Sequence, residues 1–172
     1  MSSLFSDENW SPEGALELDF TTLEGTTCYC DPDSEKAIEQ SFKNMLSAAL
    51  HWIDGGDYHY LTEIWMRKLD RPFSLLLIDN HSDDQLPSFG ADILSCGGWV
   101  AHSRRTNNML FPDSDLLYIS IDLDWLSPDY ARTNWNQGVG SLDELLDTLQ
   151  QAVSTKKLAG VDICGGITDR KS

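Results

Sequence analysis

The stretch LLLIDNHSDD, Leu75–Asp84, joins an apolar segment directly to a run of acidic and imidazole side chains. Consecutive apolar residues, as in FSLLLID (73–79), are typical of a strand that is buried on both faces of a parallel sheet. Residues two apart in an extended segment point the same way, so Asp79, His81 and Asp83 are expected to converge as the strand ends. The stretch therefore predicts a buried strand with a polar cluster at its carboxyl end.

The rest of the chain alternates between strand-like and helix-like segments. Apolar patterning predicts strands over 15–23, 51–54, 73–79, 116–124 and 158–164, and helices over 34–50, 57–69 and 141–156. Ser34 and Ser141 are predicted N-caps, and Glu144 completes a capping box with Ser141. Residues 91–105 are ambiguous because Gly97 and Gly98 weaken a helix interior. This alternation predicts an α/β fold with a mostly parallel sheet, and 172 residues without a linker predict one domain, 1–172.

Polar clusters follow three of the predicted strands, at 55–57, 79–83 and 122–124. Ligands of open α/β sheets bind outside the carboxyl ends of the strands. Asp122 and Asp124 share a face if the strand continues through them, and carboxylates this close repel unless cations lie among them. One Asp-x-Asp alone is more often a turn, but the combination favours a metal site. Oxygen and imidazole ligands suit Mn²⁺, and Mg²⁺ or Fe²⁺ less well, and two ions together could activate a water molecule.

Composition restricts the partners of the chain. The formal net charge of -16 argues against a nucleic-acid partner and is compatible with a cationic small molecule, with metal ions or with a solvated acidic surface. No apolar run approaches the roughly 20 residues of a membrane-spanning helix, so no membrane partner is expected. The amino-terminal stretch MSSLFSDENW lacks a signal-peptide pattern, which predicts a cytoplasmic protein with four reduced cysteines. A homo-oligomer is compatible with these features.

Four segments resemble motifs of the ureohydrolase family of arginases and agmatinases, in the family's order. They are DGGDYHYLT (54–62), DNHSD (79–83), SIDLDWLSPDYARTNWNQG (120–138) and LAGVDI (158–163), and they span roughly residues 50–165. The resemblance implies the three-layer α/β/α fold of arginases and deacetylases and a binuclear manganese site. It also implies a set of six metal ligands, which are His59, Asp79, His81, Asp83, Asp122 and Asp124. Two carboxylates of this set, Asp79 and Asp122, would bridge the ions.

The chain departs from the family in the parts that act on the substrate. Gly165 stands where the family has a catalytic glutamate. Cys96 stands where it has a general acid/base histidine, for which nearby His102 is a substitute candidate. His59 comes one position later than the family's ligand, a shift that a strand-to-helix turn can absorb. Cys164, at the end of the last strand, and Cys96 are both expected near the metals, where a small apolar packing role is favoured over a role as ligand or nucleophile.

The loop that resembles the family's substrate loop contains Asn134, Trp135 and Asn136, which are predicted to contact the substrate. A tryptophan offers a flat apolar wall and the amides offer hydrogen-bond donors and acceptors. The alternative is that Trp135 fills the core of a short chain. Cys28 and Cys30 follow the first predicted strand, and no mechanism is assigned to them.

Two functions remain open from the sequence. The first is a metal-dependent hydrolase of a C–N bond in a small guanidino or amide compound. The second is an arginase-like metal-binding protein, a sensor or scaffold, without ureohydrolase activity, because both the glutamate and the histidine are missing. A receiver-type phosphoryl-transfer domain is a weaker third hypothesis, since Lys156 and Lys157 precede the last strand rather than follow it.

Overall fold

The computed structural model describes residues 14–86, 90 and 92–167. Its centre is a four-stranded sheet in the order β2-β6-β5-β3, and every strand pair in it is parallel. The strands are β2 (Leu50–Trp52), β3 (Ser74–Ile78), β5 (Leu116–Asp122) and β6 (Lys157–Cys164). The mostly parallel sheet predicted from the sequence is confirmed.

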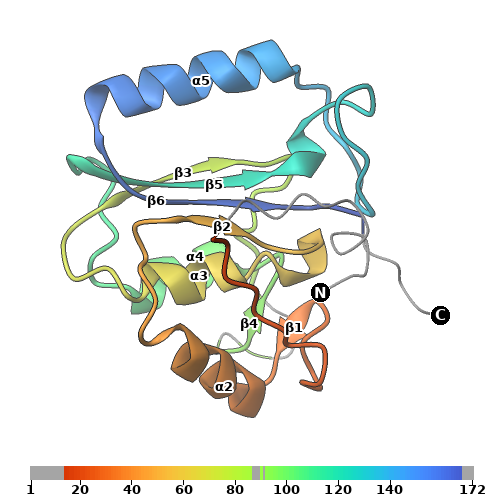
Figure 1. The fold of residues 1–172 in the computed structure, drawn as a ribbon, viewed down its shortest axis with the longest axis vertical. Helices are drawn as coiled ribbons and strands as arrows, with labels where there is room; N and C mark the ends of the chain where they lie inside the picture. Colours follow the sequence, from red (N-terminus) through yellow and green to blue (C-terminus); the bar gives the residue numbers. More distant parts are fainter. Residues whose placement is uncertain (1–13, 87–89, 91, 168–172) are drawn as a thin grey trace.

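Helices cover both faces of this sheet (Figure 1). One face is covered by α5 (Leu142–Thr155), and the other by α3 (Leu61–Met66) and α4 (Trp99–Thr106), with α2 (Pro32–Phe42) further out. A second, antiparallel pair is formed by β1 (Tyr29–Cys30) and β4 (Leu94–Ser95). The predicted three-layer α/β/α architecture is therefore present.

The register of the sheet brings the polar strand ends to one edge. Pairing of β5 with β6 ends at Asp122 opposite Cys164, and pairing of β3 with β5 ends at Ile78 opposite Ile121. Parallel strands place all their carboxyl ends on the same side. Asp79 directly follows Ile78, so it lies at the same edge as Asp122.

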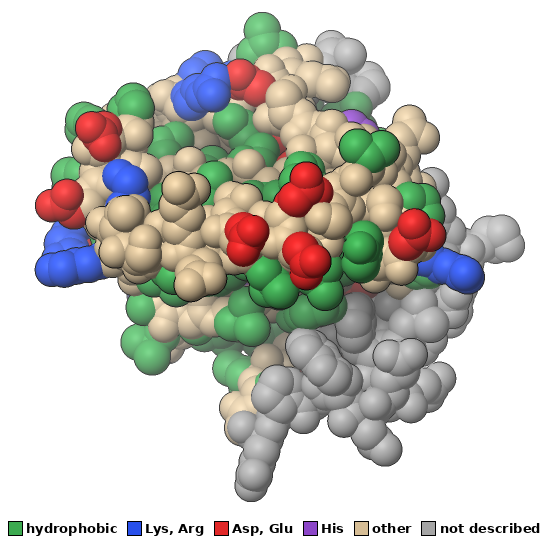
Figure 2. All heavy atoms as spheres, turned by 90° about the horizontal axis from the view of Figure 1, so that it is seen from above, with side chains coloured by type: hydrophobic (Ala, Val, Ile, Leu, Met, Phe, Trp, Pro, Cys, Tyr) green, Lys and Arg blue, Asp and Glu red, His purple; other side chains and the backbone are tan. Residues whose placement is uncertain are grey.

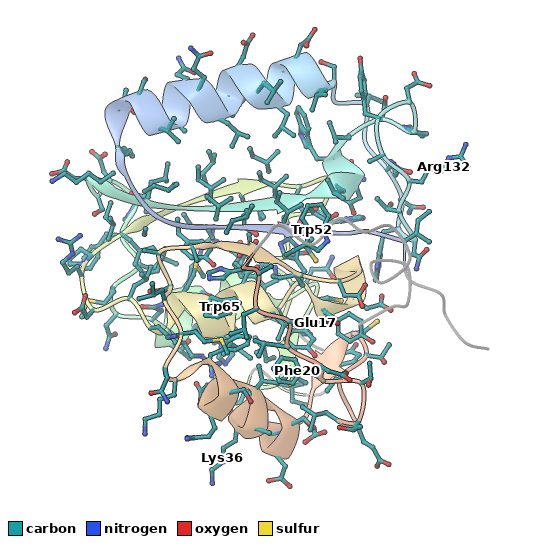
Figure 3. The ribbon with its side chains drawn as sticks, in the orientation of Figure 1. Glu17, Phe20, Lys36, Trp52, Trp65 and Arg132 are labelled. Carbon is teal, nitrogen blue, oxygen red and sulfur yellow. The ribbon has the colours of Figure 1, made fainter. Side chains whose placement is uncertain are left out.

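Apolar side chains fill the space on both faces of the sheet. Below α5, Ile119 and Ile121 of β5 are buried in one cluster with Leu145 of α5. On the other face, the ring of Trp65 lies between those of Phe42 and His51, with ring centroids 3.8 Å apart in both pairs (Figure 3). This aromatic stack joins α2, α3 and β2.

Helix α5 begins as the sequence predicts. The Ser141 hydroxyl accepts from the Glu144 amide at 3.3 Å, and the Glu144 carboxylate accepts from the Ser141 amide at 2.9 Å, which is the reciprocal pattern of a capping box. Its outer face mixes acidic with exposed apolar side chains, among them Leu146 and Val153 (Figure 2).

The strand predicted over 15–23 is wrong, because the described residues 15–23 form no strand. Phe20 instead packs against Phe42 at 6.0 Å between ring centroids. The apolar residues of this segment join the core beside α2, and alternation alone could not distinguish such packing from a strand. The N-cap of α2 is Asp31 rather than Ser34, because Asp31 accepts from the Asp33 and Ser34 amides and precedes Pro32 at the first helical position.

The other element boundaries differ where polar groups end an element early. Helix α2 ends at Phe42, where Lys68 donates to the carbonyl of Phe42, instead of continuing to residue 50. The predicted helix 57–69 is divided into the 3₁₀ turn η1 (Gly56–Tyr58) and α3, and the ambiguous segment 91–105 becomes β4 and the start of α4. Strand β5 ends at Asp122, so Asp124 lies in the 3₁₀ turn η2 (Leu123–Trp125) and not on the strand as predicted.

None of the helices in the described ranges has both the length and the apolar character that a membrane crossing requires.

Candidate metal centre

His59 lies at the centre of a cluster of carboxylates at the carboxyl edge of the sheet. Its Nδ1 atom is 3.2 Å from Asp79 Oδ2, 3.1 Å from Asp83 Oδ2 and 3.4 Å from Asp122 Oδ2. The imidazole is almost fully buried, at 1% exposed. The turn η1, which has His59 as its C-cap residue, brings this imidazole to the carboxylates.

A second cluster adjoins the first and shares Asp79 with it. His81 Nδ1 is 2.9 Å from Asp124 Oδ2 and 3.5 Å from Asp79 Oδ1. The ligand-type atoms of Asp79, His81 and Asp124 all lie within 4.8 Å of one another, as do those of His59, Asp79 and Asp83. The structure therefore brings together the six residues that the sequence predicts as metal ligands.

Backbone amides hold the carboxylates in place. Asp122 Oδ1 accepts from the Asp124 amide at 2.8 Å, and Asp124 Oδ1 accepts from the Asn80 amide at 3.1 Å. Asp79 Oδ1 accepts from the His81 amide at 2.6 Å. Each of these three carboxylates thus has one oxygen fixed by the chain, which orients the group and leaves its second oxygen for the cluster.

Asp83 is held in an unusual backbone conformation. Its φ of 47° lies in the left-handed region, which costs free energy for a residue other than glycine. The indole Nε1 of Trp99 donates to Asp83 Oδ2 at 2.6 Å, and the Trp99 ring is fully buried. Trp99 of helix α4 therefore holds the Asp83 carboxylate toward His59, although the backbone of Asp83 is strained.

Behind His59, a buried polar chain leads into the sheet. His59 Nε2 is 2.8 Å from Ser120 Oγ, and Ser120 donates to Asp162 Oδ1 at 2.6 Å. Ser120 and Asp162 have no exposed surface. Sequence reasoning missed both as site residues. The available signal was a polar residue facing inward from two otherwise apolar strands, because such groups are retained inside a protein only with partners.

The electrostatics of the cluster favour a cation. Burial, followed by the charges of its neighbours, raises the pKa of Asp124 to about 7, and burial raises that of Asp122. Burial alone would lower the pKa of His59, but its hydrogen bonds with Asp79 and Asp83 raise it well above the usual value. A protonated imidazole thus partly offsets the acidic charge. Divalent cations bound to neutral imidazoles and ionised carboxylates would offset it further, so the donor set fits metal ions.

These shifts predict how the metal-free protein responds to pH. Raised pKa values of the two carboxylic acids penalise the folded state once the acids ionise, and the raised pKa of His59 gives a stabilisation that is lost as pH rises. Both effects act in the same direction, opposite to that of the lowered pKa of Asp79, and the Asp124 contribution to stability in a chelator should fall between about pH 4 and pH 7, the ordinary and the raised pKa of this group. Asp124→Asn removes one penalty and keeps an acceptor for the Asn80 amide. We expect its melting temperature in chelator to exceed that of the wild type at pH 8 by about 3 °C, the shift for ~1 kcal/mol in a chain of this size, and to approach it at about pH 4.

Thermal melts followed by circular dichroism measure this difference. Asp84→Asn is the matched control, because it removes a carboxylate of the loop after β3 that pairs with Arg104 at the surface and belongs to neither cluster. Equal melting temperatures of wild type and Asp124→Asn at pH 8 would show that the Asp124 carboxylate carries no penalty.

Of the predicted substrate loop, Trp135 lies directly at the clusters. Its ring meets that of His81 edge-on at 5.9 Å between centroids, and its Nε1 donates to Asp57 Oδ1 at 3.1 Å. Trp135 is 36% exposed, so it covers the site from the solvent side and does not fill the core. Asn136 accepts through its carbonyl from the Asn80 side chain at 2.8 Å, and Asn134 is exposed.

The two weak catalytic candidates lie in different surroundings. His102 is buried on α4, where its Nδ1 is 3.2 Å from Glu63 Oε1 on α3, so this ring joins two helices. Cys96 is half-buried beside Cys28, and its backbone amide donates to the Cys28 carbonyl at 2.9 Å. Burial and then the charges of Cys28, Asp83 and Asp57 raise the pKa of Cys96 to about 12. Cys30 is also a free cysteine, and it is buried in the core cluster.

Gly165 and Cys164 end the last strand at the clusters. Gly165 has a φ of 94°, and a Cβ atom placed on it would be 2.1 Å from Asp122 Oδ1. Cys164 is 1% exposed, and its sulfur forms a third group of ligand-type atoms with His59 and Asp122. Burial, and then the charges of Asp122 and Asp162, raise the pKa of the Cys164 thiol well above its usual value. Cys164 thus lies beside two of the predicted metal ligands, His59 and Asp122.

Sequence comparison finds a relative of uncharacterised function. No protein-family model matches the chain. An uncharacterised protein of Thermotoga maritima is 26% identical over 171 residues, covering 83% of this chain and 68% of that protein.

Three solved structures have the same fold at low sequence identity. A hypothetical agmatinase from Burkholderia thailandensis superimposes with a TM-score of 0.59 at 16% identity, covering 80% of this chain and 59% of that one. The proclavaminate amidino hydrolase of Streptomyces clavuligerus superimposes with a TM-score of 0.59 at 18% identity, covering 79% of this chain and 62% of that one. The formimidoylglutamase of Bacillus subtilis superimposes with a TM-score of 0.57 at 15% identity, covering 77% of this chain and 59% of that one. The chain thus has an arginase-like α/β fold, and it spans about three fifths of the length of these structures.

Proposed function

We propose that this protein is an arginase-like metal-dependent hydrolase that cleaves a C–N bond of a small guanidino or amide compound. The observation that carries the proposal is the pair of donor clusters that share Asp79. A carboxylate shared by two neighbouring sets of donors is the arrangement that a binuclear site requires. The solved structures with the same fold include an agmatinase and an amidino hydrolase, which supports this class of reaction.

The donor set defines the ions that the proposal requires. The residues that would hold the ions are His59, Asp79, His81, Asp83, Asp122 and Asp124. Carboxylate and imidazole donors suit Mn²⁺, with Mg²⁺ and Fe²⁺ as alternatives. Divalent cations held there would supply Lewis-acid polarisation of the substrate and a water nucleophile at neutral pH.

The chain's own residues would orient the substrate above the clusters. Gly56 lets the indole of Trp135 approach, because a Cβ at this position would be 2.9 Å from Trp135 Cδ1 and 3.4 Å from Asp122 Oδ2. The hydrogen bond to Asp57 fixes the tilt of the ring. Trp135 thereby forms one wall of the space beside His81, and this acidic surrounding favours a cationic compound.

A second function is supported by Gly165. Gly165 stands where the ureohydrolases that this sequence resembles have a catalytic glutamate, and the contact with Asp122 leaves no room for a side chain there. A protein with the metal ligands and without this carboxylate has no evident group for holding a guanidinium. The alternative is therefore a metal-binding protein that does not hydrolyse guanidino compounds.

An assay of the metal-loaded protein distinguishes the two functions. The protein is loaded with Mn²⁺ and incubated with arginine, agmatine, other guanidino acids and small amides, and release of urea, ammonia or amine is measured. We expect turnover of at least one amide or guanidino acid, and turnover of arginine and agmatine far below about 1 per second. Metal binding without turnover of any compound would support the alternative, and failure to bind any divalent ion would contradict both.

Trp135→Ala tests the role assigned to the loop without depending on turnover. Metal addition should change the tryptophan fluorescence of the wild type, because the Trp135 indole lies against His81 and that of Trp99 donates to Asp83, and Trp135→Ala should lose the part of that change due to Trp135. The free energy of unfolding should fall by about 1 kcal/mol or less, against the 3–5 kcal/mol typical of a truncated core aromatic. Trp65→Ala, which removes a ring stacked in the core, is the control for the larger loss. A Trp135→Ala variant that loses stability like a core variant, and keeps the fluorescence response, would make the loop purely structural.

A further inference from the structure

Cys164 offers a sulfur atom to the third group of ligand-type atoms, which shares His59 with the first cluster. It is the last residue of β6, directly opposite Asp122 in the sheet register. Its sulfur and the ligand-type atoms of His59 and Asp122 all lie within 4.8 Å of one another, and all three residues are buried. The sulfur therefore lies beside two of the predicted ligands, His59 and Asp122, and the His59 imidazole connects it to the cluster of Asp79 and Asp83.

The other contacts of the sulfur are weak. The carbonyl oxygens of Asp54 and Gly55 each lie 3.5 Å from it, and thiols are poor hydrogen-bond donors. Zinc binds sulfur at about 2.3 Å and nitrogen or oxygen at about 2.0–2.2 Å, so donors about 3.5–4.5 Å apart can share one ion. The three donors lie within 4.8 Å of one another, which is close to this spacing.

The two clusters differ in their chemistry. Among the described residues, the group of Asp79, His81 and Asp124 contains oxygen and nitrogen donors alone. The group around His59 contains nitrogen, oxygen and sulfur. Thiolates select soft or borderline ions, and the affinity of a mixed site for Zn²⁺ exceeds that for Mn²⁺.

We infer that Cys164 is a thiolate ligand of the ion on the His59 side, and that this position takes Zn²⁺ in preference to Mn²⁺. The inference rests on the proposed function, since it requires that the clusters bind metal. When the sulfur–metal bond forms, the thiol releases its proton to solvent, and no group is oxidised or reduced. The His81 side keeps its preference for a hard ion such as Mn²⁺, so the centre is an asymmetric pair.

Cobalt(II) is the probe for this ligand, because a cobalt–thiolate bond gives charge-transfer absorption in the near ultraviolet. Metal-free wild type, Cys164→Ser and Cys30→Ser are titrated with Co²⁺. Cys30 is the matched control, since it is equally buried and belongs to none of the ligand groups found among the described residues. We expect the absorption in wild type and Cys30→Ser and not in Cys164→Ser.

Affinities give a second readout that does not require activity. Cys164→Ser should lower the affinity for Zn²⁺ by at least the roughly 10–100-fold that follows loss of a group beside a metal, while the affinity for Mn²⁺ changes much less. Melts in chelator check that Cys164→Ser folds. Cobalt bound without the absorption, or an absorption that survives in Cys164→Ser, would overturn the inference and leave the proposed function standing. Absence of any bound Co²⁺, Zn²⁺ or Mn²⁺ in the wild type would overturn both.

Discussion

On the proposed binuclear centre, Asp79→Asn is expected to reduce the metal content from two ions to fewer than one per chain. Asp79 is the residue that both donor clusters share, with Oδ2 directed at His59 and Oδ1 near His81. A neutral amide compensates neither ion, and its nitrogen presents hydrogens where a second ligand oxygen is needed. The hydrogen bond from the His81 amide can be kept by the remaining amide oxygen, so the local backbone should survive.

Metal content after dialysis, and calorimetric titration with Mn²⁺ and Zn²⁺, measure the effect. Asp84→Asn is the control, because it lies in the same loop, is exposed and pairs with Arg104. It should bind two ions like the wild type. Two ions retained by Asp79→Asn would contradict the shared role of this carboxylate, whereas loss of a single ion would place Asp79 on one cluster only.

Much of this site could be predicted because its polar residues lie at the carboxyl ends of strands. The apolar run before Asp79 identifies β3, and alternation places His81 and Asp83 beyond its end. The parallel arrangement then brings Asp122 to the same edge. Local pattern and topology point to the same place here, and consistency of this kind makes a sequence readable.

The errors arise where a backbone turn replaces alternation. Asp124 reaches His81 from the turn η2 and not from a strand face. The Asp122 side chain accepts a hydrogen bond from the Asp124 amide and caps this turn, so β5 ends at Asp122. Asp83 has a positive φ, so simple alternation does not describe its direction either. The six residues were predicted together, but the reason given for two of them was incomplete.

Contacts between distant segments lay beyond sequence reasoning. The chain from His59 through Ser120 to Asp162 joins η1, β5 and β6, and no spacing in the sequence reveals it. Likewise, the segment 15–23 has partial alternation, but there is no neighbouring strand with which it pairs. Such features depend on which elements become neighbours, and only the fold specifies that.

Gly165→Glu introduces the catalytic glutamate of the ureohydrolases that the sequence resembles. We expect this substitution to disrupt the proposed metal centre and not to create arginase activity. The φ of 94° disfavours any side chain, at a cost of about 1–3 kcal/mol. A Cβ would also be 2.1 Å from Asp122 Oδ1 and 3.0 Å from the Leu123 amide nitrogen. Asp122 must then move, and overpacking of this kind costs about 1–3 kcal/mol more.

Two control substitutions separate backbone strain from the collision. Gly165→Ala adds the Cβ without a charge, and Gly14→Ala adds one at a φ of 87° with no atom within 4 Å. We expect Gly14→Ala to lose about 1–3 kcal/mol of stability and to keep both ions, since strain alone acts there. Gly165→Ala should lose about 2–6 kcal/mol and at least one ion, because Asp122 is displaced as well. Gly165→Glu should lose at least as much and release no urea from arginine. Urea release by a fully metal-loaded Gly165→Glu would show that Asp122 can yield without leaving the metals, and that a single side chain separates this protein from guanidine hydrolysis.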